Sequence, residues 1–473
     1  MELSKINRDN IAKKIGHGAV LLHGGNTVYR NNDVACDFRQ DSNFHYLTEW
    51  PEPSAHAIII VQDNKAALYL FVQGRNEEME TWEGKRLGPE GAKQQFGAEE
   101  AFLYEEYESL APKLLSGIED IYCDYTNATF EKYDKKLINT AIPYDQRGSS
   151  FSKATLNSLS PLLSEFRLIK SSEELEHLKR ACDITVEGHK SAMEFTKKDM
   201  YEYQIEAEME KTFYDLGAER LGYPSIVASG DNACILHYST NREKVDNNGL
   251  ILIDAAAEFK MYSSDVTRTF PVNGKFTKAQ KDVYTEVLNA QELGIKNVTT
   301  KKTMSDIHTS TVTSISQSLV DLGLVPMGVE ETISMMHYFE FFMHGTGHWL
   351  GLDVHDAGTT EEKNKPRKLK PGMVTTIEPG IYIRPNKPEI EFKLLERDPK
   401  KIRERRKSLG MEKATKLESE EMKDAKSIKH KIPKDLLGIG IRIEDDIVCT
   451  ENDPINLTIG APKTIDDVEA ICS

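Results

Sequence analysis

The chain has 473 residues, enough for two or three domains with full hydrophobic cores. Its formal net charge of −16 would repel nucleic-acid phosphates and anionic membrane surfaces, which argues against either as the main partner. No apolar run approaches the ~18–20 residues needed to cross a bilayer, and the charged first segment lacks the apolar stretch of a signal peptide, so the cytosol is the expected location.

Residues 1–165 alternate short apolar runs with helical patterns. Strand-like runs cover residues 17–24, 55–62 and 66–73, and an acidic helix is expected over residues 98–115. Strands that alternate with helical segments are typical of α/β folds. We therefore predict a smaller α/β domain at the N-terminus.

A second domain, residues 166–473, is expected to begin with a helix. Ser171 and Glu174 have the spacing of a capping box and precede apolar residues at helical intervals. Long amphipathic helices are predicted at roughly 172–196, 200–216, 277–297 and 303–323, interleaved with strand-like runs. This pattern indicates an α+β domain in which helices cover a sheet.

A charged insertion at about 386–437 stands apart within this domain. By count, the stretch from Lys387 to Asp435 holds 16 basic and 11 acidic side chains, so it is net positive inside an acidic chain. We expect a solvated helical hairpin or a mobile loop. The alternative is a basic arm that contacts a partner or covers the active site.

Two acids lie in the run GLILIDAAAEFKMYSSDVTRTF, where Asp254 ends one apolar segment and Asp265 lies near the start of the next. Glu258, Phe259 and Lys260 can form a turn, which predicts a hairpin with both carboxylates toward one end. Either acid alone could cap a turn at a strand end. Buried carboxylates, however, persist mainly when they are paired, hydrogen-bonded or bound to metal.

Three histidines, His344, His348 and His355, lie in the glycine-rich run FFMHGTGHWLGLDVHDAG. The glycines argue against a regular helix, so we expect the histidines to line a strand and a loop around a cavity. A single histidine would more often be a core residue. Three within twelve residues favour contact with a metal or a substrate.

Two further acids, Glu378 in VTTIEPGIYI and Glu444 in GIGIRIEDDIV, each follow an alternating apolar run. Alternation predicts half-buried strands with the acid facing inward, and the alternative is a strand-end charge that faces solvent. Four carboxylates and an imidazole suit two Mn²⁺ or related divalent ions, whereas the six scattered cysteines argue against a thiolate zinc site. Such an ion pair would activate water and polarise an amide carbonyl.

At this point the residues resemble a known family, the pita-bread metallopeptidases, which include methionine aminopeptidase, prolidase and aminopeptidase P. The motifs FRQDSNFHYLTEWPEP and TWEGKRLGPEGA resemble the N-terminal domain of bacterial-type aminopeptidase P, and SGDNACILHY, DVTRTFPVNGKFTKAQ and GIGIRIEDDIV resemble its catalytic domain. The resemblance covers nearly the whole chain. It implies a pita-bread catalytic domain preceded by the smaller α/β domain, and hydrolysis of Xaa-Pro bonds in peptides with proline at the second position.

The resemblance also implies a role for each metal-binding residue. Asp254 would chelate one ion, Asp265 and Glu444 would bridge both, and His348 with Glu378 would hold the other. Glu378 is also the candidate general base.

Further positions match residues that surround the metal site in the family. His237, His344 and His355 match substrate-contacting histidines, and Arg442 matches an arginine that orients the acidic ligands. Tyr223 falls where a tyrosine would support those ligands.

The resemblance implies a homo-oligomer, a dimer or tetramer, in which Asp33 and Trp82 would reach a neighbouring subunit's site. Trp349 is equally a packed aromatic residue or a wall of the proline pocket. Arg39 and Asp41 are expected to stabilise the N-terminal domain.

The charged insertion departs from the bacterial aminopeptidase P pattern, so a prolidase restricted to dipeptides is the alternative function. A different alternative is a non-catalytic pita-bread binding module. Such modules have typically lost metal ligands, whereas all five positions are present here.

Overall fold

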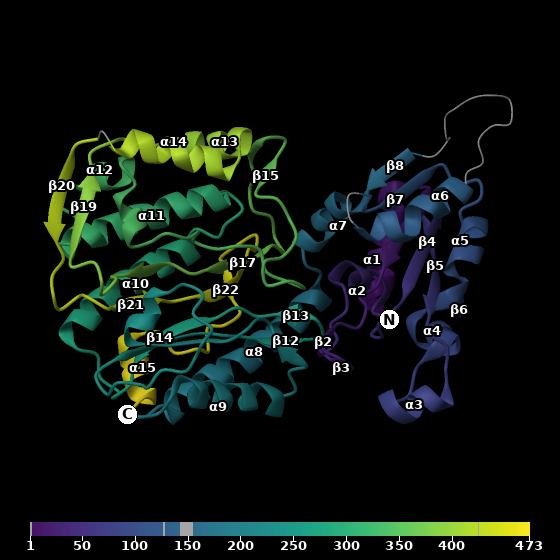
Figure 1. Ribbon diagram of the computed structural model, residues 1–473, viewed down its shortest axis with the longest axis horizontal. Coiled ribbons are helices and arrows are strands. Elements are labelled where there is room, and N and C mark those ends of the chain that lie inside the picture. The colour runs from purple at the N-terminus through teal and green to yellow at the C-terminus, as the bar shows by residue number, and fades with distance from the viewer. Residues whose placement is uncertain (1, 126–127, 142–154, 424) are drawn as a thin grey trace. The chain divides into compact units, whose positions relative to one another are not determined.

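The computed structural model describes residues 2–125, 128–141, 155–423 and 425–473. The chain divides into two compact units, Met1–Arg167 and Leu168–Ser473 (Figure 1). Among the described helices, none combines the length and the apolar character needed to span a bilayer.

The first unit is built on a six-stranded sheet with the order β6-β5-β4-β1-β7-β8. Strands β1, β4 and β5 are antiparallel neighbours, and the outer strands add in parallel. The sheet strands are β1 (Gly18–His23), β4 (His56–Gln62), β5 (Lys65–Val72), β6 (Glu100–Leu103), β7 (Asp120–Cys123) and β8 (Thr155–Ser158). The helices are α1 (Glu2–Ile15), α2 (Ser42–Thr48), α3 (Glu77–Glu83), α4 (Gly88–Phe96), α5 (Tyr107–Leu114), α6 (Lys135–Ala141) and α7 (Leu159–Leu168).

The three expected strands of this unit are confirmed, but the helix expected over residues 98–115 is wrong in its first half. Residues 100–103 form β6, which pairs in parallel with β5, and only the later residues form α5. The ring of Phe102 packs against Phe71 with centroids 5.1 Å apart. Pairing at the sheet edge therefore overrides the helix propensity of the acidic residues.

The second unit contains the four long helices expected from the sequence. They are α8 (Ser172–Phe195), α9 (Glu202–Asp215), α10 (Lys278–Lys296) and α11 (Met304–Asp321). The unit also contains the shorter helices α12 (Val329–Ser334) and α15 (Ile465–Ile471). The capping box is confirmed, since Ser171 Oγ accepts from the Glu174 amide and the Glu174 carboxylate accepts from the Ser171 amide.

The hairpin that carries the two aspartates is confirmed, with a later turn than expected. Strands β11 (Leu250–Asp254) and β14 (Thr267–Pro271) pair antiparallel, with Asp254 opposite Thr267. The turn lies at Lys260 and Met261, which both have positive φ, between β12 (Ala257–Phe259) and β13 (Tyr262–Ser263). Two further short strands pair with this hairpin: β9 (Arg220–Leu221) pairs with β12, and β10 (Ile226–Ser229) pairs with β11.

The strands that precede Glu378 and Glu444 are fully buried, so the expectation of half-buried strands is wrong. All residues of β17 (Val374–Ile377), β21 (Gly440–Arg442) and β22 (Asp445–Val448) are buried. Helix α10 packs against β17 and β21, while β14 and β11 also lie against β21. Because these neighbours and the paired strands bury every residue, the alternating sequence has no solvent-facing side. The remaining strands here are β18 (Gly380–Tyr382), paired with β21, and β23 (Ile455–Asn456), paired with β22.

The charged insertion forms the helical hairpin that was one of its two expected forms. Helices α13 (Pro399–Leu409) and α14 (Met411–Lys423) follow β19 (Glu389–Lys393) and precede β20 (Ser427–Lys431), which pairs antiparallel with β19. The ion pairs Arg405–Glu421 and Arg406–Glu418, both 2.8 Å, join the two helices.

Two small two-stranded ribbons lie outside this insertion. They are β2 (Tyr29–Asn31) with β3 (Val34–Ala35), and β15 (Glu361–Glu362) with β16 (Lys365–Pro366).

Candidate metal centre

The five expected metal ligands all lie at or near strand ends of the second unit. Asp254 ends β11 and Asp265 precedes β14, while Glu378 follows β17 and Glu444 connects β21 to β22. His348 lies in an irregular segment whose next residue, Trp349, bridges to Thr375 of β17. Strand ends from distant parts of the sequence therefore supply the polar groups of one cluster.

Asp254 and Asp265 are joined by one tyrosine. The Tyr223 hydroxyl lies 2.6 Å from Asp254 Oδ1 and 2.6 Å from Asp265 Oδ1. Arg442 Nη2 donates to the other oxygen of Asp254 at 2.5 Å. Both carboxylates are thus held in place, and the structure puts Tyr223 and Arg442 beside them.

His348 faces the acids through one nitrogen. Its Nδ1 lies 3.0 Å from the Trp349 carbonyl oxygen, which holds a proton on Nδ1 and directs Nε2 toward the acids. Nε2 lies 3.3 Å from Asp265 Oδ2 and 3.5 Å from Glu378 Oε1. Ligand atoms of Asp265, His348 and Glu444 all lie within 4.8 Å of one another. An imidazole nitrogen and several carboxylate oxygens at this spacing are a suitable donor set for a divalent ion.

Glu444 is oriented by residues that the sequence analysis missed. Thr267 Oγ1 donates to Glu444 Oε2 at 2.7 Å and accepts from Arg442 Nε at 3.0 Å. Thr267 lies two residues after Asp265 in DVTRTF, and this period-two spacing was the available signal. Tyr382, also missed, accepts from Arg442 Nη1 at 2.9 Å.

The cluster concentrates negative charge in a buried place. Burial and the charge of Asp265 raise the pKa of Glu378 to about 7, although His348 opposes this shift. Burial and neighbouring carboxylates likewise raise the pKa of Asp265 and Glu444. Burial opposes charging of His348, but its hydrogen bond and charge interactions with Asp265 raise its pKa to about 9. Such a group of acids needs more positive charge than the neighbouring side chains supply, which is what bound cations would provide.

Two of the three expected substrate histidines lie beside the cluster. His344 Nδ1 is 3.6 Å from Glu378 Oε2, and burial with the charge of Arg442 lowers the pKa of His344 to about 3, so this ring is neutral. The ring of His355 lies 4.2 Å from that of His348, and burial lowers its pKa. His237 is exposed, and it is one of the neighbours that lower the pKa of His355.

Three further positions considered from the sequence are Trp349, Asp33 and Trp82. Trp349 is only 4% exposed and packs in an apolar cluster with Leu168 and Ile377, and its Nε1 has no partner within the described part of the chain. This favours the packed-aromatic interpretation. Asp33 and Trp82 lie in the first unit, where both are exposed.

Comparison with family models gives two matches. Residues 176–451, more than half of the chain, match the model of metallopeptidase family M24. Residues 5–122 match the model of the aminopeptidase P N-terminal domain.

Two curated proteins are similar to this chain over nearly the full length of both partners. The Xaa-Pro aminopeptidase of Haemophilus influenzae is 36% identical over 453 residues, covering 96% of this chain and 93% of that protein. The Xaa-Pro aminopeptidase of Escherichia coli is 35% identical over 457 residues, with the same coverage of each chain.

Solved structures agree with these matches. A variant of Escherichia coli aminopeptidase P in complex with substrate superposes with a TM-score of 0.85 at 34% identity, covering 100% of this chain and 98% of the other. Pseudomonas aeruginosa aminopeptidase PepP gives a TM-score of 0.85 at 35% identity, covering 99% and 97% of the two chains. A zinc-substituted Escherichia coli aminopeptidase P in complex with product also has a TM-score of 0.85.

Proposed function

Because the chain belongs to metallopeptidase family M24 and begins with an aminopeptidase P N-terminal domain, we propose that it is an Xaa-Pro aminopeptidase. It would release the first residue from peptides that have proline at the second position. One observation carries this proposal: His348 Nε2 is directed at two carboxylates, Asp265 and Glu378, in a cluster that Glu444 completes.

The donor set fits two divalent ions, and we propose Mn²⁺ because hard oxygen ligands predominate. Asp254 would chelate one ion, Asp265 and Glu444 would bridge both, and His348 with Glu378 would hold the other. When bound, the ions would lower the pKa of a water molecule and polarise the scissile carbonyl.

Glu378 is the proposed general base, and His344 is placed to assist beside it. Arg442 donates to the Tyr382 hydroxyl, which lies 2.8 Å from His344 Nε2. If that hydroxyl donates to Nε2, the His344 proton is on Nδ1 and is donated to the Gly345 carbonyl oxygen, 2.8 Å away. The neutral ring is thus held beside Glu378 by contacts at both nitrogens, and it adds no charge there before the reaction.

Substrate length separates this proposal from its alternatives. Hydrolysis of a Xaa-Pro dipeptide, a Xaa-Pro-Xaa tripeptide and a longer Xaa-Pro peptide should be measured with Mn²⁺ and with a chelator. Cleavage of all three, or of the two longer peptides best, is the expected result. Cleavage of the dipeptide alone would identify a prolidase, and no cleavage with any metal would favour a binding module.

We also propose a homo-oligomer that works in the cytosol. The first unit exposes several large apolar side chains on and near the β2–β3 ribbon and on α3, namely Val28, Tyr29, Val34 and Trp82. Neighbouring exposed apolar side chains, such as those on and near the β2–β3 ribbon, are typical of protein interfaces. Light scattering with size-exclusion chromatography would give the oligomeric state. The cytosolic location rests on the six scattered cysteines, a pattern typical of unpaired thiols in a reducing compartment.

A further inference from the structure

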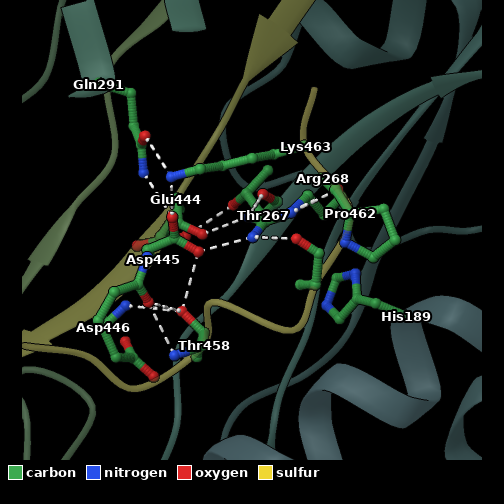
Figure 2. Close-up of polar contacts among 12 residues, drawn as sticks. His189, Thr267, Arg268, Gln291, Glu444, Asp445, Asp446, Thr458, Pro462 and Lys463 are labelled. Atoms are coloured by element: carbon green, nitrogen blue, oxygen red, sulfur yellow. Dashed lines mark hydrogen bonds and ion pairs between the residues drawn. The ribbon is translucent and has the colours of Figure 1, made fainter. Parts of the chain in front are cut away.

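A buried charge network lies directly after Glu444, and the proposed chemistry does not use it (Figure 2). Asp445 is fully buried and accepts from Arg268 Nη2 at 2.6 Å, from Lys463 Nζ at 2.7 Å and from Gln291 Nε2 at 2.8 Å. Two cations therefore share one carboxylate inside the second unit. Buried charges are costly, so a network of this kind calls for an explanation.

Arg268 uses all five of its N–H groups although its side chain is 0% exposed. Nε donates to the Pro462 carbonyl at 3.0 Å, and Nη2 donates to Asp445 and to the Ala461 carbonyl at 3.2 Å. Nη1 donates to the carbonyls of Thr267 at 2.9 Å and Glu444 at 2.5 Å. Four of these five acceptors are backbone oxygens, so the guanidinium fixes the path of the main chain.

The main chain of Glu444 is consequently held on both sides. Its carbonyl accepts from Arg268, and its amide donates to the Thr267 carbonyl at 3.1 Å. The Thr267 hydroxyl then holds the Glu444 carboxylate itself. A carboxylate that contacts a metal must be placed to within a fraction of an ångström, and its supporting hydrogen bonds determine how tightly the metal binds.

We infer that Arg268 is a positioning residue for metal binding: by clamping the Glu444 carbonyl to Thr267, it holds the Glu444 carboxylate in the direction that the ions require. This inference rests on the proposed function, because it takes Glu444 as a metal ligand. Lys463 has a different part. Its Nζ balances the charge of Asp445 and donates to Gln291 Oε1 at 3.0 Å, rather than to Glu444.

An arginine is needed at position 268 because of its shape. Its planar fork offers five donors in fixed directions, whereas a lysine ammonium offers three from a single atom. Arg268→Lys keeps the positive charge beside Asp445 but cannot reach the Glu444, Ala461 and Pro462 carbonyls together. The substitution therefore separates charge balance from positioning.

The test is a Mn²⁺ titration of the whole protein, in which free Mn²⁺ is followed by its electron paramagnetic resonance signal. Arg268→Lys is expected to raise the dissociation constant for Mn²⁺ by about 10- to 100-fold, as for other residues that support a metal ligand. The matched control, Lys463→Met, removes the other cation from the same carboxylate. It should lower the melting temperature yet leave Mn²⁺ affinity within about twofold of wild type.

Two results would overturn the inference. One is unchanged Mn²⁺ affinity in Arg268→Lys, and the other is an equal loss of affinity in Lys463→Met, which would mean that the network only stabilises the fold. If Arg268→Lys does not fold, Arg268→Gln takes its place, and unchanged affinity in that variant would equally overturn the inference. Peptide hydrolysis by the wild-type protein tests the proposed function separately, so failure of one does not imply failure of the other.

Discussion

At the scale of single residues, Glu378 carries the largest share of the proposed chemistry. It lies 3.5 Å from the His348 ring and 3.6 Å from the His344 ring. We expect Glu378→Ala to lower kcat/KM for a Xaa-Pro-Xaa tripeptide by at least about 10³-fold, because it removes both a metal ligand and the base. Loss of one of several crowded acids should leave the fold intact, so circular dichroism should show a native spectrum. Wild-type turnover at matched metal content would contradict the assignment.

Thr267 gives a second prediction, about how a ligand is oriented. Thr267→Val keeps the shape but removes the hydrogen bond to Glu444 and leaves Arg442 Nε without this acceptor. We expect a 10- to 100-fold weaker metal affinity and a loss of about 1–3 kcal/mol in the free energy of unfolding.

The control for this substitution lies two residues further along the same strand. Thr269 Oγ1 donates to the Arg442 carbonyl at 3.0 Å and is equally buried. Thr269→Val should therefore cost similar stability while metal affinity stays close to wild type. Equal metal affinity in the two variants would show that the Thr267 hydroxyl does not orient Glu444.

At the scale of helices and strands, local signals were sufficient where the sequence itself contains the stabilising interaction. The Ser171 and Glu174 capping box predicted the start of α8, because both partners are three residues apart. Strand β6 was missed because its stabilising partner, β5, lies about thirty residues earlier in the chain. The complete burial of β17 and β21 was also beyond the sequence, since it depends on which elements pack against them.

The pairing of β1 with β4 leads to a prediction about pH. His23 and His56 are directly opposite on these strands, with their Nδ1 atoms 2.7 Å apart. His23 Nε2 contacts Asp134 at 2.9 Å, so His56 is the donor in the pair. Burial lowers the pKa of His56 to about 2, and the neighbouring His23 ring adds to this shift.

The sign follows from proton binding in the two states. Unfolded His56 has a pKa near 6.5, so below this pH the unfolded chain binds a proton that the folded chain excludes. The free energy of unfolding of the first unit should fall by about 1.4 kcal/mol for each pH unit below 6.5 through this residue.

Hydrogen exchange of the β4 amides measures this local stability at pH 7 and pH 5. His56→Phe keeps a ring that can stack on Tyr104 but cannot titrate. From pH 7 to pH 5 its free energy of unfolding should therefore fall by about 2 kcal/mol less than that of wild type. His17→Gln, a change at an exposed histidine of the same unit, should behave as wild type. Identical pH dependence in His56→Phe and wild type would refute the linkage.

At the scale of the whole molecule, the candidate site depends on contacts between distant parts of the second unit. The sequence located acids at strand ends, because a carboxylate after an apolar run is visible locally. The family resemblance implied that Arg442 orients the acidic ligands, but residue patterns alone could not show its contact with Asp254 across 188 residues, or that Arg268 contacts Asp445 across 177. Tyr382 and Arg268 were missed for this reason: their importance comes from partners that only the folded chain brings together.

This arrangement predicts that metal stabilises the two units unequally. All five proposed ligands lie in Leu168–Ser473, so removal of metal by a chelator should lower the melting temperature of that unit alone. At a metal concentration 1,000 times the dissociation constant, one bound ion stabilises the unit by about 4 kcal/mol, which corresponds to roughly 6 °C for a unit of this size.

Differential scanning calorimetry with and without the chelator should therefore show one transition that moves and one that does not. Hydrogen exchange of β4 and β11 would assign each transition to a unit. Asp265→Ala is the control. Without this bridging carboxylate the chelator should no longer lower the melting temperature of the second unit. Peptide hydrolysis should be lost while the fold remains. A shift of both transitions would mean that the units unfold together, and a shift of neither would contradict the metal assignment, because a ligand that binds only the folded state must stabilise it.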